Sequence, residues 1–517
     1  MRIFSYALIL FCILTACAAP AVSPTSTAIP IPTLPPEKLK GTWLGGFEKS
    51  VGSIESFTFN FDDAELTIQP QVITWPIEVT THPDGGIQLT VTGKAGRNFE
   101  KITFTGQVSE GILTGDLTWD GETGPATFTL LAQVDSSLLE KYAGVYRFDS
   151  GRVVSVLLCP SYDDGNLQYF PPGLMYTDFT SEDSRGLYPL DSSTFGIGSA
   201  RVLGYPLEKN EIQFTINDSG EVTGLQWMDV NDPAKIETAS RILYSVEEVQ
   251  FTSEDGEVMA GLLTSPDTTE LHPAFMMLHG SEPGMKDGFG QQTLAHYMVG
   301  QGIALLTYDK RGVGDSGGTY REYPDESNVN IIASDAVAGV EYLATRPEIN
   351  SAQIGLMGGS QAGWVIPVAA AESDRVAFFV ILSGPVLSLA QEDRYSSATN
   401  DGESAVVYDA EKLDQILREM KPGGVSPIPI LAELTQPGLW LWGSVDKNVP
   451  VTVSAENLQA LIDSGKSKFS YAILANGDHN LNESSHGYFT EIPYSPRVIY
   501  FSELTSWLEE KNITPKE

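Results

Sequence analysis

Three side chains in the second half of the chain could together activate a hydroxyl group as a nucleophile. Ser360 is followed along the chain by Asp446 and then by His479. A serine hydroxyl is a poor nucleophile by itself, so it needs a base within hydrogen-bond reach. An imidazole can take the proton and return it to the leaving group, and a carboxylate can orient the imidazole and stabilise its protonated form. These residue types predict chemistry through an acyl-enzyme.

The residues around Ser360 have almost no side chains. Gly358 and Gly359 precede it, and Ala362 and Gly363 follow after a single glutamine. A serine in a strained turn between a strand and a helix needs small neighbours if its hydroxyl is to be exposed. Because the chain has 49 glycines, the pattern alone also fits a Gly-rich turn with an idle serine. The surrounding features decide between the two interpretations.

Other residues compete for the same roles. His486 is a rival base, and Asp478 is a rival acid, although a sequence neighbour of His479 points poorly at its ring. Cys159 could be a nucleophile, but it ends an apolar run that predicts a buried strand. The oxyanion formed on attack needs two fixed donors, and the backbone N–H of Gln361 is the first candidate.

Apolar strands alternate with helices around these residues. The strands are expected at residues 274–278, 303–307, 353–357, 376–382 and 439–442, and helical stretches include 329–345 and 454–462. Continuous apolar strands that alternate with helices predict a parallel sheet covered on both faces. Ser360 and Asp446 each follow a strand, and the carboxyl ends of strands are where such sheets place their sites.

The order of these features resembles the α/β-hydrolase superfamily over about residues 246–512. A first strand ends in His279, a second runs into Asp309, and Ser360, Asp446 and His479 follow in the order that this fold uses. The resemblance extends to bacterial carboxylesterases and to the neighbouring branch of serine aminopeptidases. It implies an α/β fold with a mostly parallel sheet, helices on both faces and a cap insertion.

The resemblance also implies roles for further residues. In families with this His-Gly turn, the residue after it, here Ser281, supplies the second oxyanion donor, while His279 is structural and Arg311 belongs to the scaffold. Ala362 departs from the second glycine of many relatives, but alanine is nearly as small. A cap at about 387–437 implies a small to medium substrate.

The N-terminal segment predicts export and lipid attachment. Residues 1–16 carry an apolar run typical of a signal peptide, and the end of this run, with Cys17, resembles the bacterial lipobox. Residues 17–37 are rich in Pro, Ser and Thr, as in an extended spacer. We expect a protein anchored through acylated Cys17 to a bacterial membrane and facing outside the cytoplasm; cleavage at the neighbouring alanines without lipidation is the alternative.

Two small β-domains are expected between the spacer and the α/β domain. Residues 38–135 and 136–245 contain short strands with period-two character and turn residues between them. Each predicts an antiparallel barrel or sandwich, and the catalytic domain then covers 246–517. Neither β-domain contains a catalytic set, so a structural or spacing role is expected rather than ligand binding.

Composition limits the partners of the protein. The net charge of −36 repels phosphate backbones, so nucleic acid is not expected as a partner. No cofactor or metal is implied. The expected function is hydrolysis of carboxylic esters, because no acidic residue stands out as an anchor for a substrate amino group. A serine peptidase that takes short peptides is the first alternative, and a non-catalytic ligand-binding lipoprotein is the second.

Overall fold

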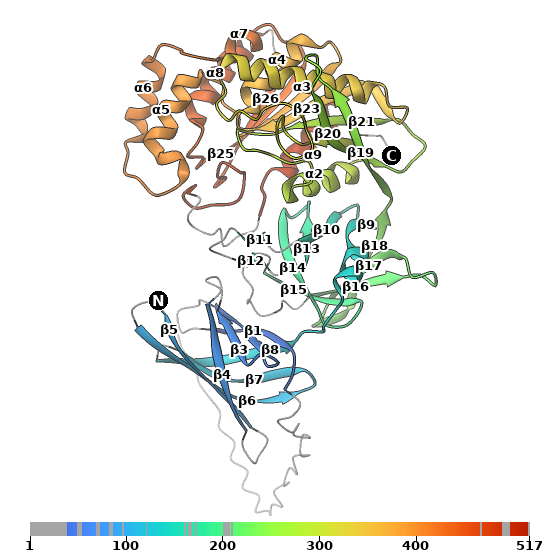
Figure 1. Ribbon diagram of the computed structural model, residues 1–517, viewed down its shortest axis with the longest axis vertical. Helices are drawn as coiled ribbons and strands as arrows, with labels where there is room; N and C mark the ends of the chain where they lie inside the picture. Colours follow the sequence, from blue (N-terminus) through green and yellow to red (C-terminus); the bar gives the residue numbers. More distant parts are fainter. Residues whose placement is uncertain are drawn as a thin grey trace, which may run out of the picture.

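The computed structural model of this chain describes residues 39–48, 54–68, 73–81, 86–95, 98–119, 121–159, 162–163, 168–170, 173–199, 207, 210–465, 468–488 and 497–514. The predicted signal peptide, Cys17 and the whole spacer lie outside these residues. Figure 1 shows three domains stacked along the long axis of the molecule. No helix in the described ranges combines the length and apolarity needed to cross a bilayer.

The first domain is a closed antiparallel barrel in which β1 pairs with both β2 and β8. Its strands are β1 (Thr42–Glu48), β2 (Ile54–Asn60), β3 (Glu65–Ile68), β4 (Ile73–Thr81), β5 (Ile87–Ala95), β6 (Asn98–Ser109), β7 (Ile112–Trp119) and β8 (Glu122–Leu130). Residues alternate between the inside and the outside of such a barrel. Buried aromatic side chains such as Phe59, Phe104 and Phe128 fill the interior.

The second domain is another closed antiparallel barrel, and α1 (Ser136–Tyr142) leads into it. Its strands are β9 (Gly144–Phe148), β10 (Val153–Cys159), β13 (Gly173–Asp178), β14 (Asp183–Pro189), β15 (Thr194–Ser199), β16 (Asn210–Ile216), β17 (Val222–Asp229) and β18 (Asp232–Ile242), with β11 (Tyr162–Asp163) and β12 (Gln168–Phe170) as a separate pair. Tyr142 stacks on Phe214 in the interior, with 4.2 Å between ring centroids. Cys159 is buried with a free thiol, and burial raises its pKa.

The C-terminal domain contains an eight-stranded sheet in the order β19-β20-β22-β21-β23-β24-β25-β26. The strands are β19 (Tyr244–Thr252), β20 (Val258–Pro266), β21 (His272–Leu278), β22 (Ala304–Tyr308), β23 (Ile349–Gly359), β24 (Val376–Leu382), β25 (Pro437–Gly443) and β26 (Lys468–Leu474). The first two form an antiparallel hairpin, and the strands from β22 onward are parallel. The carboxyl ends of the parallel strands therefore meet at one edge.

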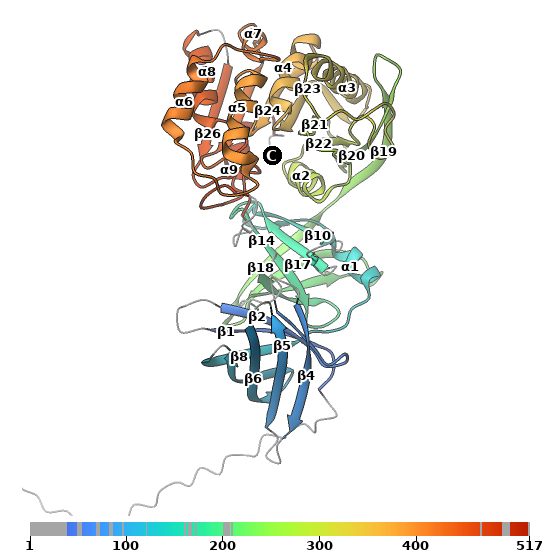
Figure 2. The same ribbon diagram turned by 60° about the vertical axis from the view of Figure 1, so that its left-hand side comes forward.

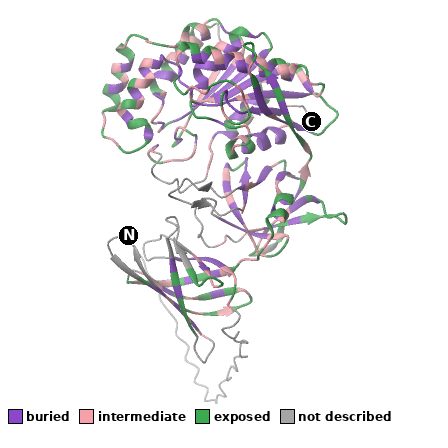
Figure 3. Cartoon of the chain, viewed as in Figure 1, coloured by how far each residue is buried: buried purple, intermediate pink, exposed green. Residues whose placement is uncertain are grey.

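Helices cover both faces of this sheet (Figure 2). One face packs against α3 (Glu326–Ala344), α4 (Ala362–Glu372) and α8 (Val451–Asp463), and the other against α2 (Phe289–Gly300) and α9 (Phe501–Glu510). Neighbouring strand residues serve opposite faces: Phe275 packs with α2 and α9, whereas Met276 packs with α3 and α4. This burial on both sides explains why the strands are apolar throughout, as the purple sheet in Figure 3 shows.

The cap lies between β24 and β25. It consists of α5 (Leu389–Thr399), a 3₁₀ turn η2 (Asn400–Gly402), α6 (Ala410–Glu419) and α7 (Ile428–Leu431). Leu413 and Leu417 on α6 form a small core with Leu387 and Tyr395. The cap thus has its own apolar contacts, and α5 lies close to the ends of β21, β23 and β24, since residues of all four elements line one cavity.

The second barrel is joined to the C-terminal domain by a buried interface. Val145, Val153 and Phe179 of the barrel belong to the same core as α2 and α9. His296 on α2 lies between two hydroxyl groups: Ser155 Oγ is 2.7 Å from its Nδ1, and Tyr244 Oη is 2.9 Å from its Nε2. The second barrel and the layer of α2 and α9 therefore share one hydrophobic core.

Candidate active site

Ser360 lies in a strained turn between β23 and α4. Its φ is +52°, in the left-handed region that residues with a side chain rarely adopt. A Cβ added to Gly358 would lie 2.6 Å from the Cβ of Ala362, and one added to Gly363 would lie 2.8 Å from Pro385. The turn can form only with glycine at these two positions, and alanine is tolerated at 362.

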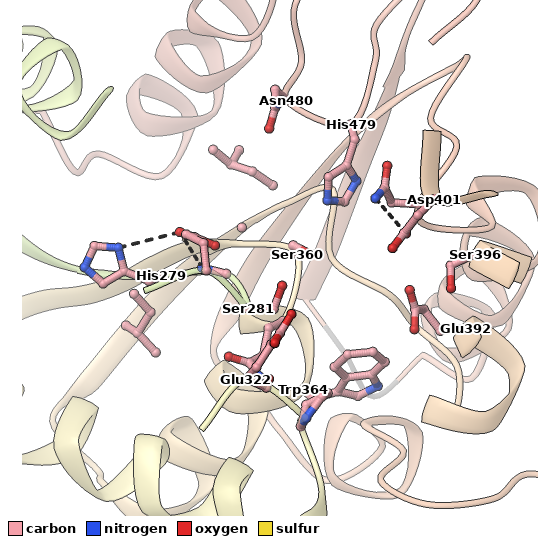
Figure 4. A pocket seen from close by; sticks show the side chains of 18 of the residues that line it. His279, Ser281, Glu322, Ser360, Trp364, Glu392, Ser396, Asp401, His479 and Asn480 are labelled. Carbon is pink, nitrogen blue, oxygen red and sulfur yellow. Dashed lines mark hydrogen bonds and ion pairs between the residues drawn. The ribbon is translucent and has the colours of Figure 1, made fainter. Parts of the chain in front are cut away.

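His479 and Asp446 form a hydrogen-bonded pair next to this turn. The Nδ1 of His479 is 2.9 Å from Asp446 Oδ2 and 3.1 Å from Oδ1. A carboxylate only accepts, so Nδ1 carries the proton and Nε2 is left as the basic nitrogen. Figure 4 shows the imidazole of His479 beside Ser360 in a common cavity. The Ser360 hydroxyl has no hydrogen bond within the described chain, which is common before substrate closes a site.

Electrostatics favour the protonated form of this histidine. Burial of the ring opposes protonation, but the charge of Asp446 and its hydrogen bond outweigh burial and raise the pKa of His479 above its ordinary value. The side chain of Asp446 is fully buried. The pair can therefore accept a proton from a hydroxyl and stabilise it on the ring.

Asp446 is itself held by the loop that carries it and by the cap. Its Oδ1 accepts hydrogen bonds from the backbone N–H groups of Asn448 (2.8 Å) and Val449 (3.0 Å). The hydroxyl of Tyr395 on α5 donates to the backbone carbonyl of Asp446 at 2.9 Å. These contacts fix the carboxylate from two sides.

A turn after β21 lies against the nucleophile. A Cβ added to Gly280 would be 3.4 Å from the Cβ of Ser360. The backbone N–H groups of Ser281 and Gln361 have no acceptor in the part of the chain that the structure describes. Two unpaired donors beside a serine hydroxyl are what an oxyanion requires.

The cavity around Ser360 has a volume of about 620 Å³ and an acidic rim. Glu322, Glu392, Asp393 and Asp401 line it, and its described lining includes no Lys or Arg. Burial, followed by the nearby charges of Asp393 and Asp401, raises the pKa of Glu392 to about 8. Among the described residues, no group of three His, Cys, Asp or Glu side chains is arranged to hold a metal.

Comparison with known proteins agrees with this geometry. The sequence profile of the Prolyl oligopeptidase family matches residues 290–494, which include the nucleophile turn, Asp446 and His479. The described residues between 244 and 514 have the strand order of the α/β-hydrolase fold. The match and the geometry together support a serine hydrolase, and we refer to this part as the hydrolase domain.

Individual relatives are more distant. The polyketide transferase claH of Penicillium crustosum is 36% identical over 102 residues, which are 20% of this chain and 32% of that protein. The polyketide transferase grgF of a Penicillium species is 32% identical over 168 residues, or 30% of this chain and 54% of that protein. The chain thus spans between a third and about half of these curated relatives. The Pyrococcus furiosus esterase Pf2001 has a TM-score of 0.36 at 17% identity, covering 52% of this chain and 93% of its own.

The two rival residues, Asp478 and His486, make other contacts than the His479–Asp446 pair. The carboxylate of Asp478 accepts the backbone N–H groups of Asn480 (2.9 Å) and Asn482 (2.8 Å), so it shapes the loop that carries His479. The ring of His486 stacks on Tyr488 and is not part of the cavity lining.

Two residues of the expected scaffold make extensive buried contacts. His279 is 3% exposed, and its Nε2–H donates to the carbonyl of Tyr308 at 2.6 Å. Arg311 pairs with Asp335 on α3 and with Asp255 in the β19–β20 hairpin. These contacts tie the loops around the site to the sheet and to α3.

Three polar residues near the site were not predicted from the sequence. Glu392 on the cap helix α5 lines the cavity, Tyr395 on the same helix contacts Asp446, and Lys310 lies beneath the cavity after β22. No acidic residue stands out in the sequence as an anchor for a substrate amino group, whereas the fold gathers several acidic side chains at the rim of the cavity. A signal in the sequence was the Glu392–Asp393 pair at the start of a helical stretch inside the cap.

Proposed function

We propose that the protein is an extracytoplasmic serine hydrolase that cleaves carboxylic esters of small to medium substrates. The observation that carries the proposal is the strained Ser360 beside the His479–Asp446 pair. In the first step, Ser360 Oγ attacks the ester carbonyl while His479 Nε2 takes its proton. The N–H groups of Ser281 and Gln361 stabilise the oxyanion.

The remaining steps return the site to its starting state. The imidazolium of His479 gives its proton to the departing alkoxide, and the C–O bond of the ester breaks. Water then attacks the acyl-Ser360 ester, and His479 takes a proton from the water and returns it to Ser360. Asp446 keeps Nδ1 protonated throughout and stabilises the imidazolium.

The test of this proposal is covalent labelling combined with ester hydrolysis. A fluorophosphonate should label the wild type and not Ser360→Ala, and p-nitrophenyl butyrate hydrolysis should fall on the order of 10⁴- to 10⁶-fold in that variant. Labelling that persists in Ser360→Ala would sink the catalytic assignment. An unlabelled, inactive wild type would favour the non-catalytic, ligand-binding alternative.

The acidic rim favours a second candidate, a peptidase or esterase for substrates with a positive charge near the carbonyl. The side chain of Glu392 has no hydrogen bond or ion pair among the described residues and faces the cavity with Ser360 (Figure 4). Acetylcholine and 3,3-dimethylbutyl acetate differ in charge at nearly the same shape. Preference for the cation above pH 8, where Glu392 is ionised, would support this candidate if it is reduced in Glu392→Gln but not in the surface variant Glu419→Gln. Faster cleavage of aminoacyl p-nitroanilides than of p-nitrophenyl esters would indicate a peptidase.

We also propose that Cys17 is lipidated and anchors the protein outside the cytoplasm. The support is the sequence around Cys17 and the uncharged stretch 20–36 after it. In Triton X-114 extraction of expressing cells, the full chain should enter the detergent phase and Cys17→Ala should not. Equal partition of the two proteins would contradict the anchor.

A further inference from the structure

Lys310 is a charged side chain buried beneath the active site. It follows β22 in the hydrolase domain and is 2% exposed. A buried ammonium group is costly unless its N–H groups find acceptors. The Nζ of Lys310 is 2.5 Å from the carbonyl of Gly280, 2.9 Å from Gln361 Oε1 and 3.4 Å from the carbonyl of Glu282. All three acceptors are neutral, so the lysine is not held by a direct ion pair.

Two of these acceptors, the Gly280 carbonyl and Gln361 Oε1, belong to the groups that supply the candidate oxyanion donors. The carbonyl of Gly280 and the N–H of Ser281 form one planar peptide unit, in which the two groups point in opposite directions. A cation that holds the carbonyl therefore fixes the N–H on the other side. Gln361 supplies the second donor from its backbone, and its side chain is bound to the same Nζ.

The rest of the turn is held from the same side. The hydroxyl of Tyr320 donates to the carbonyl of Ser281 at 2.5 Å, and its ring centroid lies 5.4 Å from Lys310 Nζ. The N–H of Gly280 is bound to Glu282 Oε1 at 3.2 Å. The N–H groups of Ser281 and Gln361 are left without acceptors in the described part of the chain, so they are preorganised for a ligand oxygen.

We propose that Lys310 is the positioning residue of the oxyanion hole, holding the Gly280–Ser281 peptide and the Gln361 side chain from behind. Lys310 acts through these groups and does not line the cavity. A hydrogen bond to a carbonyl also polarises the peptide unit and strengthens its N–H as a donor. This role rests on the proposed serine hydrolase function.

The charge of Lys310 can be lost within the working range of an enzyme. Burial lowers the pKa of Lys310 to about 8, although the nearby carboxylates of Glu282 and Glu322 act in the opposite direction. Tyr320 is the other titratable group in contact with it. Above pH 8 the positive charge disappears, and with it the polarisation of the Gly280–Ser281 peptide. The kcat for ester hydrolysis should therefore fall on the alkaline side with an apparent pKa near 8. The Glu392 carboxyl has a pKa in the same range, so this limb should be present in Glu392→Gln as well.

The experiment compares Lys310→Met with Lys286→Met. Methionine keeps an unbranched apolar chain but cannot donate. We expect Lys310→Met to lower kcat for p-nitrophenyl butyrate by about 10- to 100-fold, with KM changed by less than about threefold, and to lose the alkaline limb. Lys286 pairs with Asp309 and Asp315 and makes no contact with either donor. Its variant should lower Tm but keep the alkaline limb.

The possible results separate this inference from the proposed function. If the wild type neither hydrolyses esters or anilides nor reacts with a fluorophosphonate, the proposed function fails. If the wild type is active and Lys310→Met retains its kcat or its alkaline limb, only the positioning role fails.

If Lys310→Met does not fold, the role of Lys310 can be tested on the wild type alone by the pH dependence of inhibition. A trifluoromethyl ketone places an oxyanion in the site, so its Ki should rise above pH 8. The Ki of a neutral alcohol product should stay flat. A ketone Ki that does not change between pH 7 and 9.5 would overturn the role of Lys310.

Discussion

The active-site cavity and the interface with the second barrel each contain a nearly buried histidine, and the two behave in opposite ways. His479 contacts the carboxylate of Asp446, and its pKa is raised. Among the described residues, the ring nitrogens of His296 form hydrogen bonds with the hydroxyls of Ser155 and Tyr244 and with no carboxylate. Burial, with a smaller contribution from Arg241, lowers the pKa of His296 to about 4.

The difference between the two regions shows what makes a histidine a useful base. Desolvation disfavours the imidazolium at both places, and only a carboxylate partner reverses the balance. At the interface the same side chain stays neutral, donating one hydrogen bond and accepting another. Burial alone therefore gives a structural histidine, and the added carboxylate gives a candidate base.

Removing the negative charge of Asp446 should lower the pKa of His479, as burial lowers the pKa of His296. Asp446→Asn keeps an oxygen that can accept from Asn448 and Val449 but removes the charge. We expect kcat/KM to fall on the order of 10⁴-fold. The acid limb of the pH–rate profile should move from above pH 6.5 to below it, because burial then dominates the pKa of His479. If the variant keeps some activity and the acid limb of its profile does not move, the charge of Asp446 does not set the pKa of His479.

Acid should weaken the barrel interface through His296. The folded-state pKa of about 4 lies below the unfolded value near 6.5, so between these pH values only the unfolded chain binds the proton. The stabilisation is complete above pH 6.5 and is lost as the pH falls toward 4, on the order of 3 kcal/mol in total. In His296→Gln, Tm should depend less on pH in this window. An equal loss of Tm in both proteins would mean that other groups cause it.

The smallest effect is expected from the hydrogen bond between the cap and Asp446. Tyr395→Phe removes the hydroxyl that donates to the Asp446 carbonyl and leaves that carbonyl without this donor. We expect kcat to fall by about three- to tenfold and stability to fall by about 1 to 3 kcal/mol. Leu413→Ala, which weakens the apolar core of the cap but keeps the Tyr395 hydroxyl, serves as the control. A larger loss of kcat in this control would indicate that cap packing, rather than this hydrogen bond, supports catalysis.

Local sequence was sufficient for the features that depend on neighbours along the chain. The small residues around Ser360 predict a turn because a side chain at Gly358 or Gly363 would collide with its surroundings. The apolar strands predict a parallel sheet because both faces must be covered. Ser360, Asp446 and His479 could be named because each lies near the end of such a strand, and strand ends meet at one edge.

Only the tertiary structure decided which distant groups share an environment. Lys310 lies within hydrogen-bond distance of Gly280 and Gln361, which are 30 and 51 positions away in the sequence. Glu392 reaches the cavity through the placement of the cap, and His296 meets Ser155 across a domain boundary. The sequence by itself determined the reactive groups, since their chemistry belongs to the residue types. Their pKa values and the donors held toward the substrate depend on burial and on partners that meet only when the chain has folded.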